Sequence, residues 1–239
     1  MKIKKNVIIG IIGATDKEII PLYKKIKNFQ KKIVYNKIFY SGRLNNIKTI
    51  LVKSGVGKVS SSTTCTILLN IYKVNLIINI GTAGSLDDKL IPGNIILPHS
   101  TCYHDVDLTA FGYKLGHIQN FPKLFSINKN MIEFTETHVL KSKLNYKKNL
   151  IISGDSFINN TASKNILKKN FPTAIAVDME STAIAQVCYQ FKKPFLIIKS
   201  ISDYSDNNSK LNFEKFIDLA SQRCSNVVQD LLNNIYKKI

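Results

Sequence analysis

Arginine is almost absent from this 239-residue sequence: the 34 lysine and arginine residues include only Arg43 and Arg223, and the formal net charge is +18. A charge this high suits a nucleic-acid ligand, but base recognition favours arginine clusters interleaved with aromatic residues. Here the lysines are scattered along the chain among many Asn and Ile residues, and all three types have A/T-rich codons. We therefore predict no nucleic-acid partner and interpret the lysines as a solvated surface.

Long apolar runs and closely spaced cysteines are also missing. No stretch reaches the roughly 18 apolar residues of a membrane span, and the apolar run at 7–12 is soon followed by charged residues at 16–18. The cysteines at 65, 102, 188 and 224 form no C-x-x-C pair, so zinc binding is not indicated. Cys65 and Cys188 lie in apolar stretches and are expected to be buried free thiols. We expect a cytoplasmic protein with no membrane partner.

Apolar segments rich in Ile and Val alternate with helical patterns along the chain. Buried strands are predicted at 7–12, 47–52, 76–80, 94–97, 150–152, 174–177 and 195–198. Residues 33–40 indicate a further strand, with a turn at 41–46. Helices are predicted at 16–29, 60–72, 128–142, 162–171, 180–190 and 212–236. This alternation predicts one α/β domain over residues 1–239, with helices on both faces of a mixed central sheet in a three-layer α/β/α arrangement.

Glycines and acidic residues follow several of the predicted strands. Open α/β sheets bind ligands at the carboxyl ends of their strands, so these segments form a candidate site. Taken singly, each has a structural explanation: tight turns for the glycines, a helix-dipole acid for Glu18 and a cap for Asp203. The spacing of Gly10 and Gly13 does not fit the dinucleotide pattern G-x-G-x-x-G, so no nicotinamide cofactor is predicted.

Taken together and in order, these segments resemble the 5′-methylthioadenosine/S-adenosylhomocysteine nucleosidases of the purine nucleoside phosphorylase superfamily. The similarity runs nearly from end to end of the chain. Its motifs are IIGA at 11–14, KSGVGKV at 53–59, INIGTAG at 78–84, YHDVD at 103–107, AFGY at 110–113, SGDSFIN at 153–159, AVDME at 176–180 and ISD at 201–203. The resemblance implies a nucleoside phosphorylase-like fold and hydrolysis of the N-glycosidic bond of 5′-methylthioadenosine, S-adenosylhomocysteine and 5′-deoxyadenosine. It implies a part in methionine salvage, and neither a metal ion nor a cofactor is needed.

The resemblance also assigns roles to individual residues. Asp203 matches the acid that protonates N7 of the departing adenine, and Glu18 matches the base that activates the attacking water. Glu180 and Met179 match the pair at the ribose. The other substrate-binding positions implied are Phe157 stacked on the purine, Ile158 reading its edge through the backbone, Thr82 and Gly84 beside the nucleoside, Val56 and Phe213 in the apolar wall, and Ser202.

Cleavage of an N-glycosidic bond is consistent with two acids in opposite protonation states. The departing purine becomes negative, so Asp203 must be protonated near neutral pH, which requires that burial raise its pKa. The sugar becomes cationic, so Glu18 must be ionised when it accepts the proton of water. Inverting glycosidases use the same division of labour, with room for a water between acid and base.

The sequence departs from the family pattern near the site. Lys199 stands where relatives often have an arginine near the ribose, and lysine lacks the bidentate fork of arginine. Thr15 replaces a common methionine, and Thr82 replaces a common serine. We expect these differences to affect affinity more than reaction type.

Two other functions are compatible with the same fold. One is a phosphorolytic enzyme, and the other is a sensor or nucleic-acid-binding protein that has lost activity. We predict hydrolysis, because phosphate binding usually uses arginine forks and phosphorylase relatives tend to have arginine where this chain has Asn79. An inactive binding protein has no need for Glu18, Glu180 and Asp203 together.

Residues 103–125 lack clean periodicity but carry several aromatic residues. Irregular aromatic segments often form interfaces, so we expect a homodimer in which this segment closes the neighbouring site. The resemblance points the same way and places Phe111 and Tyr113 in the pocket of the partner subunit. Gln119 lies near a position where relatives often have proline, so the path of the segment is expected to differ there.

Overall fold

The computed structural model describes residues 7–235 and centres on a mixed sheet. Its middle contains four parallel strands: β1 (Ile8–Gly13) lies between β4 (Ile47–Lys53) and β5 (Leu76–Ser85), and β5 also pairs with β12 (Phe195–Asp203). A second parallel set consists of β11 (Ala174–Asp178), β10 (Leu150–Ser153) and β7 (Ser100–Tyr103), and β11 joins β5 in the antiparallel sense. The carboxyl ends of β1, β4, β5 and β12 therefore meet at one edge.

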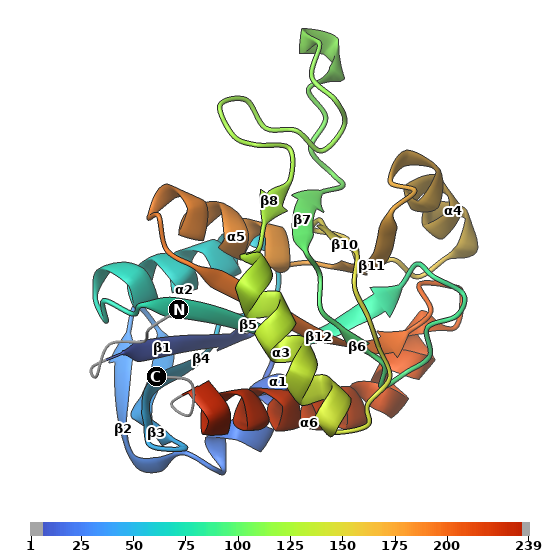
Figure 1. Cartoon of the computed structure of the whole chain (residues 1–239). Helices are drawn as coiled ribbons and strands as arrows, with labels where there is room; N and C mark the ends of the chain where they lie inside the picture. The colour runs from blue at the N-terminus through green and yellow to red at the C-terminus, as the bar shows by residue number, and fades with distance from the viewer. Residues whose placement is uncertain (1–6, 236–239) are drawn as a thin grey trace.

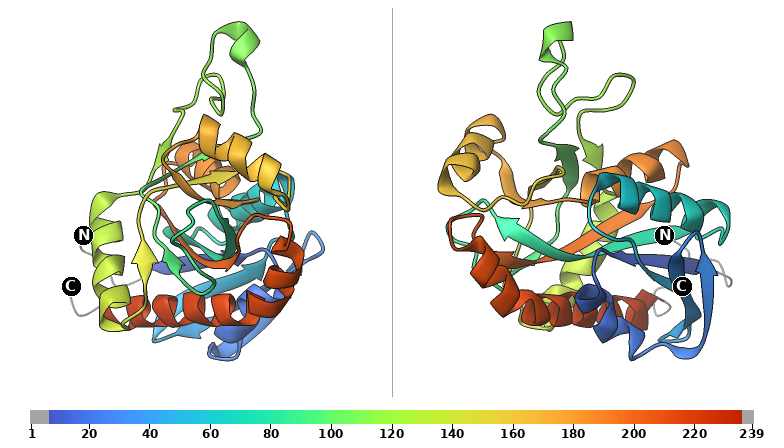
Figure 2. Two further views of the ribbon diagram at one scale, coloured as in Figure 1. Left: turned by 90° about the vertical axis from the view of Figure 1, so that its right-hand side faces the viewer. Right: turned by 180° about the vertical axis from the view of Figure 1, so that it is seen from behind.

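Helices cover both faces of this sheet, as Figures 1 and 2 show. α1 (Asp16–Tyr23) and α6 (Ser209–Ile235) lie on one face, where α6 packs on β5 and β12. α2 (Lys58–Asn70) and α5 (Ser181–Gln190) pack against each other on the opposite face. α3 (Lys129–Lys141) contacts α6, and α4 (Thr161–Asn170) precedes β11. The predicted three-layer α/β/α fold is confirmed.

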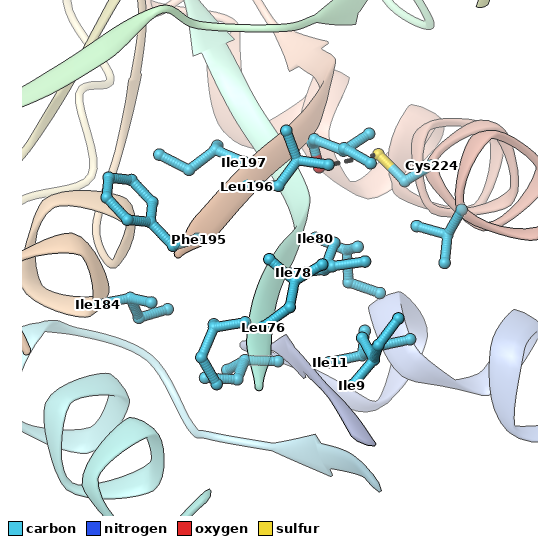
Figure 3. Close-up of a cluster of buried hydrophobic side chains, with 14 of the residues drawn as sticks. Ile9, Ile11, Leu76, Ile78, Ile80, Ile184, Phe195, Leu196, Ile197 and Cys224 are labelled. Carbon is cyan, nitrogen blue, oxygen red and sulfur yellow. Dashed lines mark hydrogen bonds between the residues drawn. The ribbon is translucent and has the colours of Figure 1, made fainter. Parts of the chain in front are cut away.

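The core lies where the central strands meet the helices (Figure 3). Ile9, Ile78 and Ile197 from β1, β5 and β12 are completely buried. A central strand covered on both faces needs apolar side chains on both, which explains the continuous Ile-rich runs. Cys65 and Cys188 are buried free thiols, as predicted, with their sulfur atoms 3.7 Å apart between α2 and α5.

The region after α1 differs from the prediction. The helix expected over 16–29 ends at Tyr23, and the chain enters β2 (Lys27–Val34). The single strand expected over 33–40 is divided between two strands, because Tyr35 and Asn36 form a turn at positive φ between β2 and β3 (Lys37–Leu44). The next turn consists of Asn45 and Asn46, also at positive φ, so most of the predicted turn at 41–46 is strand. Such turns match the twist of a hairpin. β2 is an exposed, lysine-bearing edge strand, which carries little apolar signal.

Three short strands were not predicted: β7, β8 (Phe125–Ser126) and β9 (Tyr146–Lys147), the last pairing with β6 (Ile95–Ile96). Residues 104–124, which we call the arm, project from the body between β7 and β8 (Figure 1). The arm contains one turn of 3-10 helix, η1 (Thr109–Phe111), in agreement with the predicted irregular segment. No helix within residues 7–235 is long and apolar enough to cross a membrane. The predicted ends of the domain, 1–6 and 236–239, lie outside the described residues.

Candidate active site

A pocket opens at the carboxyl ends of the central strands, where the sequence predicted a ligand site. It is lined by Gly84, Ser156, Phe157, Ile158, Val177, Asp178, Met179, Asp203 and Ser205. Five of these residues belong to the predicted site: Gly84 in β5, Asp203 in β12, and Phe157, Ile158 and Met179 in loops after β10 and β11. The fold thus brings together residues far apart in the sequence.

Glu18 lies in the first turn of α1 and is only 3% exposed. Its Oε2 accepts hydrogen bonds from the backbone N–H groups of Ala14 at 2.7 Å and Thr15 at 3.0 Å. Its Oε1 accepts from the backbone N–H of Thr82 at 2.8 Å and from the Thr82 hydroxyl at 3.0 Å. Gly81, at φ +142, leaves the space that this carboxylate fills, because a Cβ there would overlap Oε1. α1 and β5 together therefore position Glu18.

Asp203 ends β12 and is 2% exposed. Its Oδ2 accepts from the Ser202 hydroxyl at 2.8 Å, and its Oδ1 accepts from the backbone N–H of Ser205 at 3.0 Å. Burial raises the pKa of Asp203, against the opposing effect of these hydrogen bonds. Gly84 is needed opposite, since a Cβ there would lie 2.9 Å from Oδ1. The side chain is thus a candidate proton donor facing the pocket.

Glu180 caps the start of α5 and belongs to a buried charge cluster with Lys199 and Asp178. The Lys199 ammonium is fully buried, 2.9 Å from Asp178 Oδ2 and 3.8 Å from Glu180 Oε2. Burial alone would lower the pKa of Lys199, but Asp178, Glu180 and Glu18 raise it above its usual value. Burial raises the pKa of Glu180 to about 7, while Lys199 acts in the opposite direction. Glu180 Oε1 also accepts from the backbone N–H of Gly57 at 3.0 Å.

Two serine hydroxyl groups donate hydrogen bonds to the Asp178 carboxylate. The Ser153 hydroxyl donates to its Oδ1 at 2.6 Å, and the Ser181 hydroxyl lies 2.5 Å from its Oδ2. The same Ser181 hydroxyl is 2.8 Å from Asn79 Oδ1, which ties the cluster to β5. These contacts hold the Asp178 carboxylate beside the Lys199 ammonium.

Three of the predicted apolar positions, Phe157, Ile158 and Met179, line the pocket, whereas Val56 and Phe213 are not among its lining residues. Phe157 is 43% exposed, and its ring meets that of Phe213 edge-on at a centroid distance of 5.9 Å. Ile158 and Met179 are half-buried. Val56 is exposed, and it precedes the Gly57 amide that binds Glu180.

Phe111 and Tyr113 are not brought into this pocket of their own chain. Both belong to the arm, which projects away from the body in Figures 1 and 2. The Phe111 side chain is 78% exposed, and the Tyr113 ring packs edge-on against His117 at 5.2 Å.

Several features of the site were not predicted from the sequence. Asp178 received no role, although its place directly before Met179 and Glu180 at a strand end was a usable signal. The Gly57 amide and the ion pairs of Lys199 depend on contacts over long sequence separations. In residues 7–235, no group of three or more His, Cys, Asp or Glu side chains could hold a metal ion.

Fold and site define an α/β protein whose buried carboxyl groups lie at the carboxyl ends of parallel strands. The family model of the phosphorylase superfamily matches residues 8–233, and the chain belongs to this superfamily. The relatives are more specific. A 5′-methylthioadenosine/S-adenosylhomocysteine nucleosidase from Buchnera aphidicola subsp. Baizongia pistaciae is 53% identical over 236 residues, covering 99% of this chain and 94% of that protein.

Solved structures agree with this relationship. The 5′-methylthioadenosine/S-adenosylhomocysteine nucleosidase of Neisseria meningitidis, in complex with methylthio-immucillin-A, aligns with a TM-score of 0.93 at 30% identity, covering 95% of this chain and 99% of that chain. The S-adenosylhomocysteine nucleosidase of Streptococcus pyogenes, in complex with 5-methylthiotubericidin, aligns with a TM-score of 0.94 at 33% identity, covering 98% and 99%. The resemblance stated from the motifs is confirmed.

Proposed function

We propose that this chain hydrolyses the N-glycosidic bond of 5′-methylthioadenosine and S-adenosylhomocysteine, and also of 5′-deoxyadenosine, releasing adenine and the 5-substituted ribose. The observation that carries the proposal is the pair of buried carboxyl groups, Glu18 and Asp203, at one edge of the sheet. Relatives and structural neighbours with this activity in their names support it. The enzyme would act in the cytoplasm, in methionine salvage.

Asp203 donates the proton that lets adenine leave. The purine carries negative charge as the bond to the sugar breaks, and a proton placed on N7 neutralises it. A buried carboxyl with a raised pKa retains this proton to higher pH than an exposed aspartate. Phe157 stacks on the purine, and Ile158 reads its edge through backbone groups.

Glu18 accepts the proton of the attacking water. Its carboxylate accepts four hydrogen bonds, so both oxygens are held in place by donors from two elements. This negative charge also stabilises the cationic sugar in the transition state. The water oxygen bonds to the sugar carbon as the bond from that carbon to adenine breaks. Glu18 gains one proton from the water, and Asp203 loses one proton to N7 of adenine, so the protons balance.

Glu180 accepts hydrogen bonds from the ribose hydroxyl groups, and Met179 packs against the sugar. The nearby Lys199 ammonium favours the ionised form of Glu180 and opposes the effect of burial. Thr82, Gly84, Val56, Ser202 and Phe213 complete the substrate-binding set.

The nucleophile is water, not phosphate. Both arginines of the chain donate to backbone carbonyls, Arg43 to Asn46 at 2.8 Å and Arg223 to Gly93 at 2.7 Å. The Asn79 side chain is engaged with Ser181 and with the Ile12 carbonyl. Neither arginine lines the pocket, which supports a site without an arginine fork for phosphate.

The enzyme acts as a homodimer in which the arm closes the pocket of the neighbouring subunit. The exposed Phe111 ring supports this arrangement. Exposure of a large apolar side chain to water is unfavourable, and a partner subunit that covers the ring removes this cost. Phe111 and Tyr113 would supply an apolar wall for the thioether tail of the substrate.

The test is chromatography of adenine released from 5′-methylthioadenosine, S-adenosylhomocysteine and 5′-deoxyadenosine, with and without phosphate. We expect adenine from all three at rates independent of phosphate. The absence of adenine from the first two substrates would refute the nucleosidase assignment. A ribose 1-phosphate product, or a rate proportional to phosphate, would assign the chain to phosphorolysis.

A further inference from the structure

The helix α2 begins without a capping side chain of its own. Its N-cap residue is Gly57, at φ +93, so the first N–H groups of the helix need acceptors from elsewhere. Two carboxylates provide them: Asp155 Oδ1 accepts from the Lys58 N–H at 2.8 Å, and Glu180 Oε1 accepts from the Gly57 N–H at 3.0 Å. A side chain at 57 would press on Asp155, since a Cβ there would lie 2.9 Å from Oδ1.

Asp155 is itself fixed by a closed ring of interactions. Its backbone N–H donates to Asp105 Oδ2 at 2.9 Å, and the Lys58 ammonium donates to the same oxygen at 2.6 Å. The Lys58 ammonium also lies 3.9 Å from Asp155 Oδ2. Lys58 is thus linked to Asp155 twice: its backbone N–H donates to the Asp155 carboxylate, and its ammonium binds Asp105, at the base of the arm, which in turn accepts from the Asp155 N–H.

The ring joins three of the sequence motifs, KSGVGKV, YHDVD and SGDSFIN, through charged side chains to which the proposed chemistry gives no role. Lys58 and Asp105 are about one-quarter exposed, at 26% and 25% of their side chains. The Lys58–Asp105 ion pair also lowers the pKa of Asp105, against the opposing effect of burial. Neither side chain lines the pocket, so their effect on the substrate must pass through another residue.

We propose that Lys58 and Asp105 are positioning residues that fix the Gly57 N–H against Glu180 and so orient Glu180 for the ribose. The inference rests on the proposed function, in which Glu180 binds the sugar hydroxyls. The proposal predicts a larger effect on recognition of the ribose than on recognition of the base, because Glu180 accepts directly from the Gly57 N–H, whereas the ring reaches the loop of Phe157 and Ile158 only at Asp155.

The experiment compares Lys58→Met and Asp105→Asn with Lys58→Arg and with Lys148→Met. Lys148 is a matched control, because its ammonium pairs with Glu136 at 2.7 Å on a surface outside the pocket. We expect Lys58→Met and Asp105→Asn to raise the KM for 5′-methylthioadenosine about tenfold with little change in kcat, because loss of one bond to a charged acceptor has about this effect. Lys58→Arg and Lys148→Met should retain the original KM.

Inhibition by free adenine distinguishes positioning from general distortion, since adenine lacks the ribose. We expect the inhibition constant of adenine to rise much less than the KM for 5′-methylthioadenosine in Lys58→Met. An unchanged KM, or an equal weakening of adenine and of 5′-methylthioadenosine, would overturn the inference while leaving the nucleosidase function intact.

Hydrogen exchange at the Gly57 amide provides a readout independent of activity. Exchange should be faster in Lys58→Met than in Lys148→Met, and equal rates would overturn the inference. An unsubstituted protein that releases no adenine would refute the proposed function instead, and the exchange rates would still decide whether the ring holds the Gly57 amide.

Discussion

The substitution Asp203→Asn separates proton donation from structure at this site. Asparagine has the shape of aspartate, so its oxygen can accept from the Ser205 N–H and its amide can donate to the Ser202 hydroxyl, the two contacts that Asp203 makes at 3.0 and 2.8 Å. What it cannot do is deliver a proton to N7 of adenine. The variant therefore removes one chemical step and keeps the surrounding hydrogen bonds.

The expected loss in kcat is about 10²- to 10⁴-fold, the range for a general acid, which corresponds to about 2.7–5.4 kcal/mol of activation free energy. The free energy of unfolding of Asp203→Asn, in contrast to kcat, should not decrease. Because burial raises the pKa of Asp203, its contribution to stability is complete below the unfolded pKa and is lost as pH rises through the folded pKa. Asparagine carries no such pH-dependent loss, so the variant should be at least as stable as the original protein at pH 7 and above.

The assay is adenine release at saturating 5′-methylthioadenosine, combined with urea unfolding of both proteins across pH. A variant that keeps more than about one-tenth of the original kcat would refute the role of Asp203 as proton donor, because a general acid contributes far more. A variant that loses activity and stability together would show that Asp203 is a structural cap of the β12 terminus.

Three further outcomes are expected. Glu18→Gln should lower kcat by orders of magnitude and destabilise the fold by about 1–3 kcal/mol, because the NH₂ group of glutamine would face N–H donors that the glutamate oxygen now accepts from. Adenine release and urea unfolding measure the two effects, and near-normal values would contradict the mechanism. The KM for 5′-methylthioadenosine should rise as pH falls below about 7, since Glu180, with a pKa of about 7, accepts fewer bonds from the ribose when protonated; a KM that stays flat in a pH series would exclude this role. Phe111→Ala should leave the free energy of unfolding of the single chain within about 0.5 kcal/mol, because the ring is exposed there, but should raise the KM for 5′-methylthioadenosine. A fully active monomer in sedimentation, or an unchanged KM, would place the whole site within one chain.

The clearest failure of sequence reasoning concerns the region after α1. The helical spacing of apolar residues continues past Tyr23, and no local sequence signal marks the start of β2 at Lys27. β2 is an exposed edge strand whose pairing with β3 is decided by the turn at Tyr35 and Asn36. Neither a glycine nor a proline marks that turn, so its signal in the sequence is weak.

At the site, the sequence predicted the acids but not their partners. The rule that ligands bind at strand ends points to the segments that carry Glu18, Glu180 and Asp203, and the family resemblance gives these acids their predicted roles. The two Thr82 donors to Glu18 and the ion pairs between Lys199 and Asp178 or Glu180 required the structure, because they join segments that lie apart in the sequence. The same holds for the ring of Lys58, Asp105 and Asp155.

The buried central strands and most of the helices follow from the sequence alone, because apolar periodicity and the length of each run are local properties of the chain. The strand-end acids follow for the same reason. The tertiary structure decided how those acids differ: burial raises the pKa of Asp203, while Glu18 accepts hydrogen bonds from the segment before α1 and from β5. Burial and electrostatic environment depend on every segment packed around a group, and only the folded chain brings those segments together.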